Sequence, residues 1–193
     1  MNGLEGTYFH IRVLIGMVVS LAIGNLLRGV ARVIGDDEHR PVYRVQFVWA
    51  AFMLAAILHF WWWEIRFDLL PQFTFPIFAF WILYVLQLFF LTALLMPEKL
   101  GRHENNQEHF LASRRWFFGF LALFFVLDYA ESLLKGADYV RSLGPMYPVR
   151  NALFVVGCLL AIGTASPTFH RVFAGVALVS QLAWLAWMTH LGY

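Results

Sequence analysis

Two acidic residues stand three positions apart in an apolar run, in the stretch "FFVLDYAESLLKG" at 124–136. Residues at this spacing share a helix face, so Asp128 and Glu131 are expected to lie close together. A carboxylate is costly to place in hydrocarbon and therefore usually faces protein or water. A carboxyl group withdrawn from water also takes up a proton more readily than one in water. The pair is the strongest candidate in the sequence for a site on an ion or proton pathway.

The alternative is a structural pair, with the carboxylates satisfied by Arg28, Lys135 or Tyr129. Arg28 has a neighbour on the same helix face, Arg32, four positions later. Long basic side chains near a helix end can reach out to lipid phosphate. Both arginines are therefore candidates for binding lipid phosphate or for pairing with a carboxylate.

Two amide side chains, Asn25 and Gln87, lie deep in other apolar runs. They could complete the pathway beside the acids, or they could join helices by hydrogen bonds. Near the first amide, Gly16, Ser20 and Gly24 recur every four residues, and such a stripe of small residues permits close helix packing. The packing could lie within one subunit or between subunits, and a homo-oligomer is expected.

Three histidines, His10, His59 and His190, are expected near one membrane surface. Two of them could bind haem iron axially, or a divalent metal. However, no helix carries two histidines four residues apart, and a histidine beside tryptophan is ordinary at a membrane interface. We therefore expect no cofactor, with haem as the alternative.

Motifs of known enzyme classes are missing. The sequence contains no G-x-S-x-G, no H-E-x-x-H and no phosphate-binding glycine loop. The net charge of +2 is spread over helix ends and gives no sign of nucleic-acid binding. We expect a protein that is not an enzyme.

The composition indicates an integral membrane protein. Of the 193 residues 61% are hydrophobic and 13% are charged, and the mean hydropathy is +0.66. A soluble domain usually carries roughly twice that charged fraction. A spanning helix needs about 20 mostly apolar residues, and six segments qualify. They are 10–34, 41–66, 73–97, 114–134, 147–166 and 168–191. The fold class is therefore an all-α bundle of six transmembrane helices that forms a single domain over 1–193.

Lysine and arginine are more frequent near the helix ends that follow the first, third and fifth segments than near the other ends. Because basic residues favour the cytoplasmic side, both termini are expected outside the cytoplasm.

A shift of 107 positions aligns "LLRGVARV" at 26–33 with "LLKGADYV" at 133–140. With three helices in each unit, a duplication would make the two halves inverted relative to each other, as in many transporters. A 3+3 inverted repeat is one interpretation, and a chance likeness of segments rich in leucine and valine is the other.

The stretch "SRRWFFGFLALFFVLDYAESLLKG" at 113–136, with "LLRG" at 26–29 and "HFWWW" at 59–63, resembles a family of small six-helix bacterial inner-membrane proteins. The resemblance covers most of the chain. It implies a multi-pass protein of the bacterial inner membrane, and it implies no activity.

The six-helix plan also looks broadly like the bacterial relatives of the lysosomal potassium channel. That family carries a Phe-Ser-Asp signature in its first helix. The corresponding helix here reads "IRVLIGMVVSLAIGNLLRG" and lacks the signature. No pore residue of that family is therefore carried over.

Three functions remain open. The first is a channel or transporter for protons or small ions, with the carboxylate pair near the path. The second is a non-enzymatic sensor or scaffold subunit that acts through partner proteins in the membrane. The third is a redox protein that binds haem or a quinone. The first two differ in whether the acids face a wet cavity or a dry contact between helices.

Overall fold

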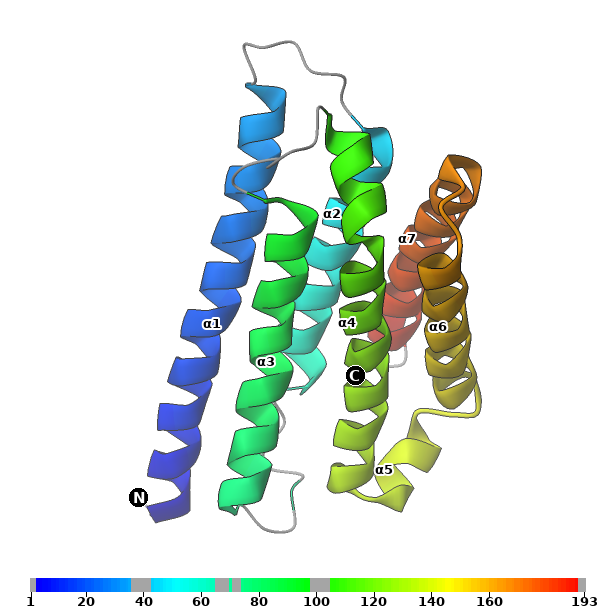
Figure 1. Ribbon diagram of the computed structural model, residues 1–193. Coiled ribbons are helices and arrows are strands. Elements are labelled where there is room, and N and C mark those ends of the chain that lie inside the picture. The colour runs from blue at the N-terminus through cyan, green and yellow to red at the C-terminus, as the bar shows by residue number, and fades with distance from the viewer. Residues whose placement is uncertain (1–2, 36–42, 65–69, 71–73, 98–104, 191–193) are drawn as a thin grey trace.

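The computed structural model describes residues 3–35, 43–64, 70, 74–97 and 105–190. This part of the chain is helical (Figure 1). The elements are α1 (Gly3–Ile34), α2 (Arg44–His59), the π-helical turn η1 (Phe60–Glu64), α3 (Phe75–Leu95), α4 (Asn106–Lys135), α5 (Ala137–Ser142), α6 (Met146–Gly163) and α7 (Pro167–His190).

All the long helices of the described part are candidates for membrane spans. Six helices, α1, α2 with η1, α3, α4, α6 and α7, are long and apolar enough to cross a membrane. Many large apolar side chains point outward, and Leu83, Leu153 and Val179 are 66%, 66% and 68% exposed. Soluble proteins rarely expose apolar surface so widely. The expected all-helical class with six apolar helices is confirmed.

The start of α4 differs from the sequence prediction. The helix begins at Asn106, eight residues before the expected start at 114. Asn105 caps it, because its side-chain oxygen accepts a hydrogen bond from the backbone N–H of Glu108 at 2.9 Å. Asn106 to His109 lie between the expected segments 73–97 and 114–134, and they form the first turn of the helix. The expected helix ends at 41–42, 65–66, 73 and 191 lie outside the described residues.

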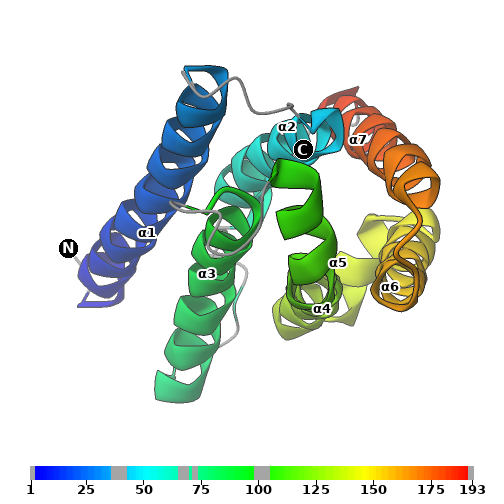
Figure 2. The ribbon, with the colours of Figure 1, turned by 45° about the horizontal axis from the view of Figure 1, so that its top comes forward.

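Packing places α2 and α4 in the middle of the bundle. Helix α4 packs mainly along α6, α2 along α7, and α1 along α3 (Figures 1 and 2). Trp49 of α2 is fully buried, and its ring lies 5.2–5.5 Å from those of Phe52, Phe117, Phe118 and Phe173. Edge-to-face contacts of this kind add to the energy of burial. The core that fixes α2 against α4 and α7 is therefore aromatic.

The close contact between α1 and α3 depends on Gly29. A Cβ atom at this position would lie 2.3 Å from the Cβ of Met96, which follows α3. At the other end of the bundle, Gly136 has φ = +117° and ends α4. Only glycine adopts such a backbone conformation readily. The turn at Gly136 directs α5 away from the axis of α4 (Figure 1).

The two halves of the chain are packed differently. Helix α1 packs mainly on α3, the third long helix of its half, whereas α4 packs mainly on α6, the second long helix of its half. This difference gives no support to the 3+3 repeat, which stays a prediction.

Candidate functional site

Asp128 lies in a contact between three helices. Its side chain is buried on α4, and its Oδ2 accepts hydrogen bonds from the hydroxyl of Tyr147 at 2.8 Å and from Nδ2 of Asn151 at 2.5 Å, both on α6. Oδ1 is 3.4 Å from the hydroxyl of Tyr84 on α3, which donates to it. The Tyr147 hydroxyl also lies 2.8 Å from that of Ser132, one turn after Asp128 on α4. Three neutral donors from α3 and α6 therefore reach the carboxylate.

The sequence of α6 explains this arrangement. Tyr147 and Asn151 are four residues apart and share one face of the helix. Phe154 and Cys158 continue this buried face. The Phe154 ring stacks on Phe125 of α4 with the ring centres 4.2 Å apart. The contact between α4 and α6 is thus polar near the start of α6 and aromatic beyond it.

Glu131 has a different partner from Asp128. Its Oε1 lies 2.8 Å from Nζ of Lys135, four residues later on α4, and both side chains are fully buried. Nζ also donates to the backbone oxygen of Trp63 in η1 at 3.5 Å and lies 5.0 Å from the ring centre of Tyr139. The sequence named Arg28, Lys135 and Tyr129 as partners of the acids, and the structure places Lys135 beside Glu131.

Arg150, one turn into α6, extends the polar contacts toward α2 and α7. Its guanidinium donates to Oε1 of Gln181 on α7 and to Oδ1 of Asn151 at 3.2 Å. Gln181 Nε2 in turn lies 3.3 Å from Nδ1 of His59, at the end of α2. We call the joined residues the polar network. They are His59, Tyr84, Asp128, Ser132, Tyr147, Arg150, Asn151 and Gln181.

The space inside the polar network is small. Asp128, Arg150, His59 and Gln181 line a cavity with about 10 Å³ for the centre of a water molecule. A single water needs roughly 10–15 Å³ by this measure. The acid therefore faces a nearly dry helix contact that holds at most about one water molecule.

The predicted amides lie away from Asp128. Asn25 of α1 donates to the hydroxyl of Thr92 on α3 at 3.4 Å, and Gln87 of α3 donates to the backbone oxygen of Phe120 on α4. Phe120 precedes Asp128 by eight residues, which is about 12 Å along a helix. The structure does not bring either amide to the carboxylates, and both join neighbouring helices.

The predicted arginines lie at the other end of the bundle. Arg32 donates to the backbone oxygen of Pro97, just after α3, and Arg28 is exposed one turn earlier on α1. This end is remote from the end of α4 that carries Glu131 (Figure 1). Arg28 therefore does not neutralise the acids, and its exposure is compatible with a lipid phosphate contact.

The three histidines do not come together. His10 and His190 are exposed on α1 and α7, which lie on opposite sides of α2 (Figure 2). His59 is buried, with its ring centre 5.0 Å from that of Trp63. Within the described residues no cluster of three or more His, Cys, Asp or Glu side chains could hold a metal ion. Haem ligation was the alternative to the expected lack of a cofactor, and a Soret absorption band in the purified protein would test it.

Tyr84, Tyr147, Arg150 and Asn151 are members of the polar network that the sequence did not single out. Arg150 lies near the start of the expected segment 147–166, as other basic residues lie near helix ends. Two polar residues in succession, Arg150 and Asn151, lie one turn inside an apolar helix. This pattern could have identified Arg150 from the sequence. A charged residue within a span is expected to face the protein and to have a partner.

Comparison with known proteins adds no assignment, since no family model, no curated protein and no solved structure matches the chain.

Proposed function

We propose that this is a multi-pass protein of the bacterial inner membrane that binds and transfers protons at Asp128. The observation that carries the proposal is this carboxylate, buried within a candidate spanning helix and hydrogen-bonded to side chains from two other helices. Ionisable residues inside a membrane span often mark ion or proton routes.

The geometry favours a proton over a larger ion. The cavity beside Asp128 has room for about one water molecule. A hydrated metal cation needs several oxygen ligands and more space. A proton needs only a chain of groups that can gain and lose it, and the hydroxyls of Tyr147 and Ser132 lie 2.8 Å apart beside the acid. On the other side, His59 and Asp128 line the same cavity, where one water could join them.

The finer features of the proposal rest on the sequence. The location in the inner membrane follows from the family resemblance, and the orientation with both termini outside the cytoplasm follows from the lysine and arginine distribution. A homo-oligomer belongs to the proposal because a six-helix bundle has little interior room. A path for an ion larger than a proton would then lie between subunits. The 3+3 inverted repeat would fit a transporter, but the proposal does not depend on it.

The test is proton flux into liposomes, measured with an enclosed pH-sensitive dye under an imposed membrane potential. The wild type should exceed empty vesicles, and Asp128→Asn should reduce the flux at least tenfold. Asp138→Asn is the matched control, because Asp138 lies nearby on α5 with its side chain 96% exposed. It should leave the flux unchanged. Flux of potassium in place of protons, or no flux over a range of pH and voltage, would overturn the proposal.

A scaffold or sensor subunit is the second candidate function. It is favoured by the dryness of the contact and by the linkage of five helices, α2, α3, α4, α6 and α7, through the polar network. If the wild type carries no flux and Asp128→Asn lowers the unfolding temperature, the polar network is structural and the search turns to partner proteins.

A further inference from the structure

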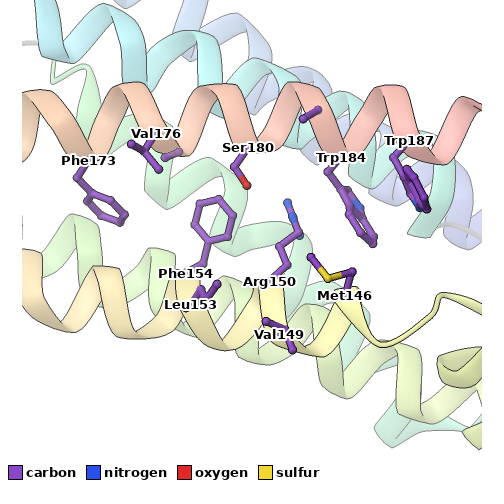
Figure 3. A pocket seen from close by; sticks show the side chains of 12 residues that line it. Met146, Val149, Arg150, Leu153, Phe154, Phe173, Val176, Ser180, Trp184 and Trp187 are labelled. Atoms are coloured by element: carbon purple, nitrogen blue, oxygen red, sulfur yellow. The ribbon is translucent and has the colours of Figure 1, made fainter.

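Helices α6 and α7 form a hairpin whose two arms are splayed apart. The connection between them is short, since α6 ends at Gly163 and α7 begins at Pro167. However, α6 packs mainly on α4 and α7 packs mainly on α2, so the two helices contact each other little. Between them a groove of about 430 Å³ remains (Figure 3).

This groove has the character of a ligand site. Its volume falls within the range of about 300–1,000 Å³ that is typical of small-molecule sites. The lining is mostly apolar, with Phe154 and Phe173 toward one end and Trp184 and Trp187 toward the other (Figure 3). From Phe173 to Trp184, the tryptophan beside Arg150, the groove follows α7 for 11 residues, which is about 16 Å. This length suits an extended hydrocarbon chain whose head group lies at Arg150.

Arg150 supplies the charge of the groove. It is the charged residue among the described residues that line it, and Figure 3 shows its side chain between the two helices, near Ser180. The guanidinium lies 5.1–5.4 Å from the ring centres of Phe125, Phe154 and Trp184. These aromatic rings leave only a small part of Arg150 exposed, which favours a small and flat partner.

Trp184, whose ring lies against the Arg150 guanidinium, adds a buried donor at the same place. Trp184 is 8% exposed, and its indole N–H is buried without a hydrogen-bond acceptor among the described residues. A buried donor without an acceptor is energetically unfavourable. An oxygen atom bound beside Arg150 would lie close to this indole ring.

We propose that the groove between α6 and α7 binds a long-chain fatty acid from the bilayer, with its carboxylate at Arg150. A carboxylate offers two oxygens in a plane that match the guanidinium. It is also smaller than a phospholipid head group and fits the limited exposure of the arginine. The apolar part of the groove between Arg150 and Phe173 holds the acyl chain. This site shares Arg150 with the polar network around Asp128, but it does not depend on proton transfer there.

The experiment uses the full chain in vesicles of neutral phosphatidylcholine. A palmitic acid analogue with a photoreactive diazirine in mid-chain is added, and cross-linked residues are mapped by mass spectrometry. The cross-links should concentrate on groove residues such as Leu153 and Val176. Unlabelled palmitic acid should compete with the probe at least tenfold better than hexadecanol, which has the same chain without the charge.

Two variants separate head-group binding from folding. Arg150→Gln should remove the preference for the acid over the alcohol, but it also alters the polar network. Val176→Trp fills the groove from a position that is 61% exposed, and it should reduce cross-linking at least tenfold without touching the polar network. Leu83→Trp is the matched control on the exposed face of α3 and should leave the cross-linking unchanged.

Three outcomes would overturn the proposal. Cross-links spread evenly over all exposed helix faces would mean that the groove holds bulk lipid only. Equal competition by hexadecanol would mean that Arg150 does not select the head group. Cross-links from the groove to a second copy of the chain, with no fatty acid bound, would mean that the groove is a subunit interface.

Discussion

Two acid–base pairs lie close together along the chain, one buried and one exposed, with their acidic residues seven positions apart. Glu131 and Lys135 are fully buried at the end of α4, with 2.8 Å between the charged atoms. Asp138 and Arg141 form a similarly short pair on α5, at 2.7 Å, with side chains 96% and 77% exposed. The turn at Gly136 separates them. Similar spacing and similar chemistry therefore give no indication of burial, which depends on the helices that pack against each pair.

The difference matters because ion pairs have different energies in the two settings. An exposed pair contributes about 0–1 kcal/mol, since water already solvates both charges. In a buried pair each charge depends on its partner, and removing one of them leaves the other uncompensated. We therefore expect the loss of a single charge to have large effects at the end of α4 and almost none on α5.

The largest effect is expected for Lys135→Met. The substitution leaves Glu131 buried without its cation and should lower the free energy of unfolding by about 3–5 kcal/mol. The measurement is unfolding in mixed micelles with increasing denaturing detergent.

Its control is the double variant Glu131→Leu/Lys135→Met, which removes both charges and should recover most of the loss. If the single variant were as stable as the wild type, Glu131 would not depend on Lys135, and the contrast with the exposed pair would fail.

The second effect concerns Asp128, which is buried one turn before Glu131 and accepts hydrogen bonds from Tyr84, Tyr147 and Asn151. Tyr147→Phe removes the hydroxyl that donates to Oδ2 at 2.8 Å and keeps the ring. Hydrogen bonds to charged groups contribute about 1.5–3 kcal/mol, so the same unfolding assay should show a loss of this size. Tyr129→Phe is the matched control, because Tyr129 follows Asp128 on α4 and is only partly buried. An equal loss of unfolding free energy in both variants would mean that the assay measures a general effect of replacing tyrosine. The hydrogen bond to Asp128 would then not be its cause.

Much of the fold could be predicted from the sequence because each spanning helix is a long run of apolar residues. About twenty apolar residues in succession are needed for a span, and the polar residues between the spans mark most of the ends. The early start of α4 was missed because a polar stretch such as "NQEH" fits a loop as well as a capped first turn. The Asn105 cap, which decides between them, depends on one hydrogen bond.

The candidate site could be predicted only in part: its acidic residues were identified from the sequence, and most of their partners were not. Asp128 and Glu131 were found because an acid is conspicuous in an apolar run. Their partners were harder to identify because Tyr147, Asn151 and Gln181 are ordinary residues in a membrane helix until the packing of α6 and α7 is known. The separation of Asn25 and Gln87 from the acids is likewise a result of tertiary packing. The position of a residue within its own helix does not tell which residues of the other helices it contacts.

The smallest effect is expected for Asp138→Asn, and it completes the comparison. The exposed carboxylate is solvated by water and screened by salt, so its removal should change the free energy of unfolding by less than about 0.5 kcal/mol. The unfolding assay at low and high salt measures this directly, with Arg141→Gln as the reciprocal variant. A loss comparable to that of Lys135→Met would mean that α5 is covered by a partner or a second copy of the chain. The Asp138–Arg141 pair would then be buried in the assembly, and it would differ from the Glu131–Lys135 pair only in the isolated subunit.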